Sequence, residues 1–133
     1  MFTQLYRFIA VVSFAFLAGC ASGPTPQQIA AADYGTAIDQ DQAEERIKQY
    51  FSGTLKDPYS AQYQFGAIQK GYVIGSAIEG KQLYAGYLIT ANVNAKNSYG
   101  GYTGNQGYQF LFQNGALVKG LKMSPGGMMM PLF

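Results

Sequence analysis

The longest regular pattern of hydrophobic and polar positions in the chain begins at Leu83. From there to Ala95 every second residue is apolar, which is typical of a strand with one face against a core. The residues on that face are Leu83, Ala85, Tyr87, Ile89, Ala91, Val93 and Ala95. The alternate positions start apolar at Tyr84 and Leu88 and become polar from Thr90 onward. The pattern predicts a long, half-buried strand.

A second pattern, with apolar residues three and four positions apart, runs through residues 40–55. Its apolar positions are Ala43, Ile47, Tyr50, Phe51 and Leu55, with Glu44, Glu45, Lys48 and Gln49 on the opposite side. This periodicity predicts an amphipathic helix with acidic residues near its start, where the helix dipole favours them. Asp57-Pro58 is expected to end it. A shorter helix is expected over 25–32, where Thr25 is the cap and Pro26 the first helical residue.

Further strands are indicated on both sides of the long one. Residues 62–67 alternate, and 72–74 are expected to continue the same edge after Gly71. Alternation returns at 108–113, where Asn114-Gly115 suits a two-residue hairpin turn into a return strand over 116–121. The predicted fold is therefore α+β, one main amphipathic helix packed on an antiparallel meander of about four strands. Two outcomes fit the methionine-rich tail: it covers a sheet edge or it is mobile.

The first nineteen residues resemble a secretion signal. A short segment carrying Arg7 precedes the apolar run Phe8–Ala18, which is short for a membrane span. We therefore expect a lipoprotein signal peptide over 1–19, a tether and N-terminal segment over 20–38, an α+β domain over 39–122 and a C-terminal tail over 123–133.

Leu17-Ala18-Gly19-Cys20 looks like the lipobox of bacterial lipoproteins. By that resemblance Cys20 becomes the new N-terminus and carries a diacylglyceryl group, so the expected partner of the chain is a membrane. Two or three acyl chains give stable anchoring where one is marginal. In the lipoprotein sorting pattern Ala21 implies the outer membrane of a Gram-negative cell, with the domain facing the periplasm. In a Gram-positive cell the same anchor implies the outer face of the cell membrane.

The composition argues against most kinds of enzyme. The chain has no His, and its only cysteine is Cys20, so the commonest general base and a free catalytic thiol are both missing. Asp57 is expected to accept local backbone hydrogen bonds, and Glu79 is expected to be solvated in a turn. No phosphate-binding glycine loop and no metal-ligand spacing is present, so we expect no cofactor and no metal. The formal charge of +2 is too small to indicate nucleic acid.

The segment 94–104 (Asn-Ala-Lys-Asn-Ser-Tyr-Gly-Gly-Tyr-Thr-Gly) is the most unusual part of the sequence. It combines hydrogen-bonding amides with flat aromatic rings, and its glycines allow close approach. The candidate binding residues are Asn94, Asn97, Ser98, Tyr99 and Tyr102. The same composition also suits a compact loop that is hydrogen-bonded to itself. The sequence favours this structural interpretation over a binding edge for glycan or peptide.

In three segments the chain resembles a family of small, uncharacterised bacterial lipoproteins. These are Ala-Asp-Tyr-Gly at 32–35, Leu-Lys-Asp-Pro-Tyr-Ser-Ala-Gln-Tyr at 55–63, and the stretch 93–104 that contains Asn-Ala-Lys-Asn-Ser-Tyr-Gly-Gly-Tyr-Thr-Gly. Together they span most of the expected mature domain. The resemblance implies the domain limits and the helix-plus-sheet fold, but no activity or ligand.

Three functions compete. The first is a non-enzymatic envelope module that contacts a protein or peptidoglycan from its membrane tether. The second is a receptor for a small ligand or glycan that uses the 94–104 loop and the exposed end of the long strand. The third is an enzyme that would rely on Lys96 or Lys70 with Ser98, or on tyrosine chemistry, which no spacing in the sequence requires.

Overall fold

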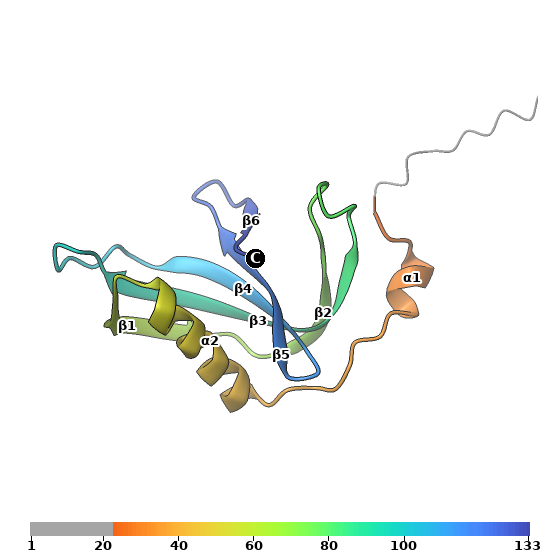
Figure 1. The fold of residues 1–133 in the computed structure, drawn as a ribbon, viewed down its shortest axis with the longest axis horizontal. Helices are drawn as coiled ribbons and strands as arrows, with labels where there is room; N and C mark the ends of the chain where they lie inside the picture. Colours follow the sequence, from red (N-terminus) through yellow and green to blue (C-terminus); the bar gives the residue numbers. More distant parts are fainter. Residues whose placement is uncertain (1–22) are drawn as a thin grey trace, which may run out of the picture.

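The computed structural model describes residues 23–133, so the expected signal peptide and Cys20 lie outside the described residues. Two helices precede a single sheet (Figure 1). The elements, in chain order, are α1 (Pro26–Ala30), α2 (Gln40–Thr54), β1 (Asp57–Phe65), β2 (Gln69–Ile74), β3 (Leu83–Lys96), β4 (Gln106–Gln113), β5 (Ala116–Met123) and β6 (Met129–Pro131).

The sheet is antiparallel throughout and is organised around β3. One edge of β3 pairs with two strands in tandem: β2 pairs with its first half and β1 with its second half. The other edge pairs with β4, which is followed by β5 and β6. Because β3 has 14 residues, it is long enough to hold both partners on one edge.

The predicted architecture, one main helix on a meander of about four strands, is wrong. The described chain is mostly sheet, with six strands and two short helices. Residues 62–67 and 72–74 were predicted as one continuous edge strand. They do lie along one edge of β3, but as two strands that residues 66–68 separate. The prediction also left out β6, whose three residues are ordered by pairing with β5.

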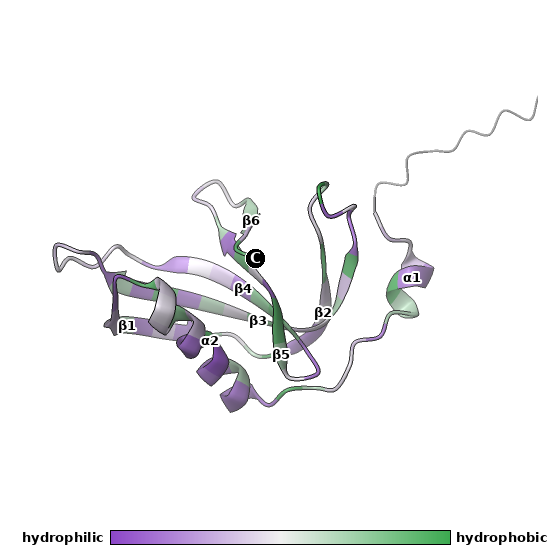
Figure 2. Cartoon of the chain, viewed as in Figure 1, coloured by the Kyte–Doolittle hydropathy of each residue, from purple (hydrophilic) through white to green (hydrophobic). Residues whose placement is uncertain are grey.

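α2 covers one face of the sheet. Ala43, Ile47 and Phe51, four residues apart, are its buried positions, and they pack in one cluster with β3 and β4. The strand residues of this core are Ile89, Ala91, Val93, Phe110 and Phe112. Figure 2 shows the outward side of α2 in hydrophilic colours, as expected of an amphipathic helix.

The start of α2 is held by a side chain inside the helix and not by its N-cap. Asp39 is the N-cap, but its side chain makes no capping hydrogen bond. Instead the Gln40 side chain donates to the Gly66 carbonyl at 3.0 Å and accepts from the Ile68 N–H at 3.0 Å. This pair of bonds ties the helix to the connection between β1 and β2. Thr25, by contrast, caps α1 in the expected capping box.

The opposite face of the sheet, which we call the open face, carries a second apolar region and a polar region. Leu111 and Val73 are buried on it near β2 and β5. The β2–β3 and β5–β6 hairpins rise on this side, away from α2 (Figure 1). Beyond the hairpins, toward β1, the open face is polar.

The methionine-rich tail covers a sheet edge, which decides between the two outcomes that fit its sequence. β6 pairs with β5, and the Leu132 N–H donates to the Gly120 carbonyl at 2.8 Å. The Phe133 ring then lies 5.4 Å from the Tyr50 ring, centroid to centroid, beside Gly120. The chain end thus anchors the edge of the sheet to the core beneath α2.

Candidate functional site

The loop after β3 is a compact hairpin held by its own backbone and by Asn97. The Asn97 N–H donates to the Gly101 carbonyl at 2.8 Å. The Asn97 side-chain oxygen accepts from the N–H groups of Tyr99 and Gly101 at 2.9 and 3.1 Å. Gly100 adopts a φ of 81°, a left-handed conformation that favours glycine. The Asn97 oxygen is therefore already engaged inside the loop.

Asn94 closes the base of the same loop. Its side-chain oxygen accepts from the Gly104 N–H at 3.0 Å, while the Thr103 N–H donates to the Ala95 carbonyl at 3.1 Å. These contacts agree with the interpretation of the segment as a self-hydrogen-bonded loop. Two of the five predicted binding residues, Asn94 and Asn97, thus have their amide oxygens engaged in loop structure.

Tyr102 joins the loop to the beginning of β1. Its hydroxyl donates to the Ser60 carbonyl at 3.2 Å, and the Lys96 ammonium lies 5.4 Å from the centre of its ring. The Ser60 hydroxyl in turn accepts from the Lys96 N–H at 2.8 Å. One side of Tyr102 is thus occupied, although the residue remains 46% exposed.

Tyr99 and Ser98 are the two predicted residues that the loop presents to solvent. Tyr99 is 97% exposed at the tip, and Ser98 beside it is also exposed. A tyrosine held in this position by a hydrogen-bonded loop is a rigid, amphipathic contact with little side-chain entropy to lose on binding. Of the predicted set, Tyr99 is the residue best placed to meet a partner.

Tyr59 belongs to the same end of the sheet and was missed by the sequence analysis. It is fully exposed, one residue before the Ser60 carbonyl that Tyr102 contacts. The alternation of Tyr63 and Phe65, extended backward, would place Tyr59 on the face beneath α2. A register shift between Asp57 and Gln62 breaks that phase and turns Tyr59 outward. We call Tyr59, Tyr99 and Tyr102 the aromatic tip.

A group of uncharged polar side chains follows the aromatic tip along the open face. Opposite partners in the register are Gln62 with Asn94, Gln64 with Asn92 and Thr90 with Gln109. Paired residues of antiparallel strands share a face, so these side chains form one continuous surface. Most of them are exposed. We call this surface the amide face.

The main ionic contact of the open face lies at the far side from the aromatic tip. Glu79 is paired with Lys119 and also accepts from the Tyr84 hydroxyl at 3.1 Å and the Ser76 N–H at 2.9 Å. The hydrogen bond from Lys119, then those from Ser76, hold the pKa of Glu79 at about 2. Glu79 lies in the expected turn and its side chain stays 29% exposed, but it is not free in solvent, because it is bound to Lys119. It fastens the β2–β3 loop to β5.

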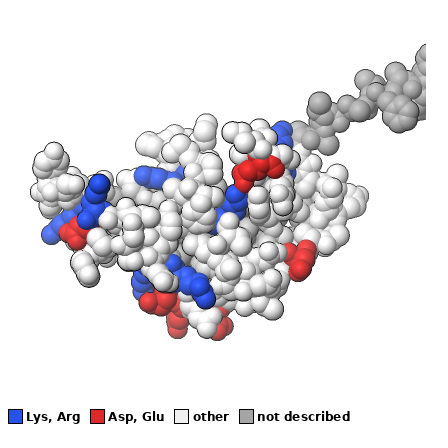
Figure 3. All heavy atoms as spheres, viewed as in Figure 1, with Lys and Arg blue, Asp and Glu red and all other residues white. Residues whose placement is uncertain are grey.

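The described residues hold neither a candidate metal centre nor a candidate membrane-spanning helix. Between residues 23 and 133 we find no group of three potential metal-ligating side chains. Within the same range no helix is both long and apolar enough to cross a bilayer. The side of the molecule in Figure 3 shows acids and bases scattered over a mostly uncharged surface. What remains as a candidate site is the aromatic tip with the amide face.

We found no protein-family model, no curated protein and no solved structure that matches the chain. The resemblance to small bacterial lipoproteins therefore stays a prediction, as does lipid attachment at Cys20.

Proposed function

We propose that the chain is a lipid-anchored, non-enzymatic module of the bacterial envelope that binds an extended partner, a protein or peptidoglycan, through its aromatic tip. The observation that carries the proposal is the exposure of Tyr59 and Tyr99, both at least 97% exposed at one end of the sheet. Aromatic side chains that project from a rigid support are typical anchors of binding surfaces.

The placement of the tip supports this proposal. The chain enters the described structure at residue 23, at one end of the long axis, and the 97–104 loop lies at the other end (Figure 1). A domain tethered through Cys20 would therefore hold its tip far from the anchor. In a Gram-negative cell we propose the outer membrane as the site of anchoring, with the tip directed into the periplasm.

The amide face supports an uncharged partner. Side-chain amides donate and accept hydrogen bonds without a charge, which suits sugar hydroxyls and peptide groups. Because this surface is an open strand face continuous with the tip, it fits an elongated partner better than an enclosed small molecule. Tyrosine rings beside such amides add flat apolar area.

A photo-crosslinking experiment in cells tests the proposal. A benzophenone amino acid at position 99 is expected to capture a partner, and the same probe at Tyr72, an exposed tyrosine on β2, is the matched control. Purified peptidoglycan sacculi test the non-protein alternative by co-sedimentation. With the probe kept at position 99, Tyr59→Ala should weaken the capture, because one anchor is worth about 2 kcal/mol or more. The double variant Tyr59→Ala/Tyr99→Ala, without a probe, should abolish co-sedimentation with sacculi. Equal capture from positions 72 and 99, without sedimentation, would contradict the proposal.

The alternative, a receptor for a small ligand, is favoured by one observation. A hollow of about 250 Å³ on the open face is lined by Thr90, Gln109 and Lys70, among others. This alternative predicts that a soluble sugar or peptide raises the melting temperature by binding in this hollow. A thermal-shift screen in which Thr90→Val removes the response would support it.

A further inference from the structure

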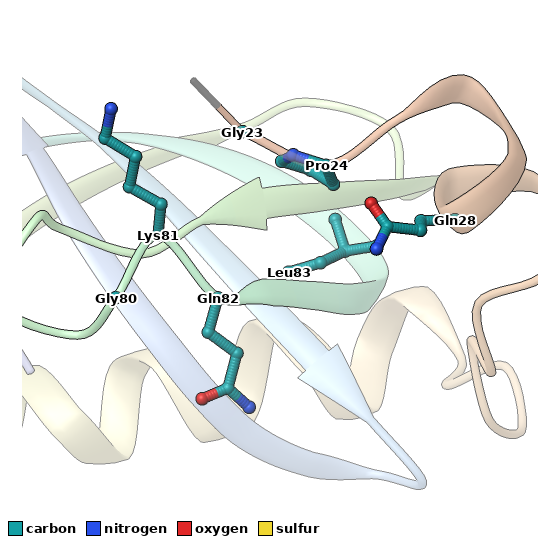
Figure 4. Close-up of a pocket in the computed structure, with 7 residues that line it drawn as sticks. All are labelled: Gly23, Pro24, Gln28, Gly80, Lys81, Gln82 and Leu83. Atoms are coloured by element: carbon teal, nitrogen blue, oxygen red, sulfur yellow. The ribbon is translucent and has the colours of Figure 1, made fainter. Parts of the chain in front are cut away.

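The chain enters the domain beside the β2–β3 hairpin. Gly23 lies against the Ile74 side chain, since a β-carbon built at Gly23 would be 3.9 Å from it. Gly23 and Pro24 also line a hollow together with Gly80, Lys81 and Leu83 (Figure 4). The first described residues are thus packed against the loop that joins β2 to β3.

Covalent geometry limits how far the expected anchor lies from this loop. Cys20 precedes Gly23 by three residues. Consecutive Cα atoms are about 3.8 Å apart, so the two Cα atoms are separated by about 11 Å at most. If Cys20 carries lipid, the membrane surface is within that short reach of Gly23, and the β2–β3 loop must lie next to it.

The β2–β3 loop has the surface chemistry that a membrane interface requires. Ile78 is fully exposed at its tip, between the exposed Ala77 and the partly buried Glu79. Glu79 is turned toward Lys119, which neutralises the only carboxylate of the loop. The exposed charge that remains is the ammonium of Lys81. An apolar tip beside a cation suits the boundary between acyl chains and anionic headgroups.

The loop is also held rigidly enough to present Ile78 outward. The N–H groups of Glu79 and Lys81 donate to the Ser76 carbonyl at 3.1 and 3.0 Å. Glu79 accepts from both the Ser76 N–H and the Ser76 hydroxyl at 2.9 Å. Ile78 is therefore exposed because the turn fixes it there.

A second apolar tip lies on the same side of the molecule. Met128, in the β5–β6 hairpin, is 70% exposed. The two hairpins are neighbours, because Ser76 and Glu79 of one line a cavity with Met129 and Pro131 of the other. Figure 1 shows both tips rising on the side away from α2.

We infer that the tip of the β2–β3 loop, with Ile78 at its apex and Lys81 beside it, inserts into the interface of the membrane that holds the lipid anchor. The inference rests on the proposed anchoring at Cys20. Contact at this loop places the point of insertion at one end of the long axis, and the aromatic tip lies at the other end (Figure 1).

Site-specific fluorescence in vesicles tests this contact. The full chain is purified from membranes as the Ile78→Cys variant, with Tyr99→Cys as the matched control, and is labelled with an environment-sensitive nitrobenzoxadiazole. Both positions are almost fully exposed, so neither change disturbs packing. A lipidated Cys20 has no free thiol, so only the introduced cysteine reacts. The proteins are reconstituted in phosphatidylethanolamine–phosphatidylglycerol vesicles with or without doxyl-labelled lipid.

We expect the label at position 78 to show blue-shifted emission and quenching by doxyl lipid, and the label at 99 to show neither. Emission from position 78 that matches water, in protein whose mass includes the lipid, would overturn the membrane contact and leave the anchor intact. Equal quenching at both positions would overturn a membrane contact that is specific to the β2–β3 loop. A mass without lipid would remove the proposed anchor and the inference with it.

Discussion

The two hydrogen bonds accepted by Asn97 are the most direct test of how the 94–104 loop is held. Asn97→Ala removes the oxygen that accepts from Tyr99 and Gly101. A neutral hydrogen bond contributes about 0.5–1.5 kcal/mol, and water replaces part of that at an exposed site. We therefore expect the loop to lose about 1 kcal/mol of stability against local opening.

The assay is amide hydrogen exchange followed by NMR. A loss of about 1 kcal/mol corresponds to roughly fivefold faster exchange at the Tyr99 and Gly101 amides if they exchange through local opening. Asn97→Asp keeps an accepting oxygen at the same place and should retain most of the protection. Ser98→Ala alters an exposed neighbour and should change nothing.

Two results would refute the reasoning about Asn97. Unchanged exchange in Asn97→Ala would mean that the backbone bond from Asn97 to Gly101 is sufficient to hold the loop. An Asn97→Asp variant as damaged as Asn97→Ala would mean that the accepting oxygen is not the cause.

Two further predictions concern stability. The pKa of Glu79 falls from 4.5 to about 2 on folding, so its stabilising effect is present above pH 4.5 and is lost as the pH falls toward 2. Urea titrations between pH 4.5 and 2 should show that the free energy of unfolding falls more for the wild type than for Glu79→Gln. If the free energy of unfolding depends on pH in the same way in both proteins, the stabilising ion pair is contradicted. Gly120→Ala places a β-carbon 2.8 Å from the Phe133 ring. It should displace the chain end and lower the melting temperature by several degrees, as about 1–2 kcal/mol of overpacking implies. Deletion of Phe133 should relieve most of that effect; a Gly120→Ala protein as stable as wild type would show that the contact is unimportant.

Elements with a repeating pattern of apolar residues could be predicted from the sequence. The pairing of individual short strands in the sheet could not. The alternation from Leu83 and the helical spacing from Ala43 correspond to β3 and α2. Asn114 and Gly115 both have positive φ, as their turn chemistry indicates. β2 was not separated from β1, because only the length of β3 allows two strands to share one edge. β6 has only three residues, too few to show a pattern of its own. It forms because it pairs with the edge strand β5.

The sequence indicated the loop that forms part of the candidate site. It did not indicate which side chains of that loop are bound within it and which are free to contact a partner. The loop composition pointed to Asn94 and Asn97 without showing that their oxygens accept from the loop backbone. Tyr59 was missed because it lies in an irregular part of β1, between Asp57 and Gln62, where the register shifts and the alternation no longer indicates burial. The pairing of Glu79 with Lys119 joins residues 40 positions apart. Such a contact follows only from the tertiary fold.

The anchor at Cys20 is the claim on which the orientation of the whole domain depends, and intact mass spectrometry tests it directly. Protein purified from its native membrane should have the mass of a chain that begins at Cys20 and carries a diacylglyceryl group. The Cys20→Ser variant should lack that mass and leave the membrane fraction. An unlipidated wild-type chain, recovered free of the membrane, would contradict the account.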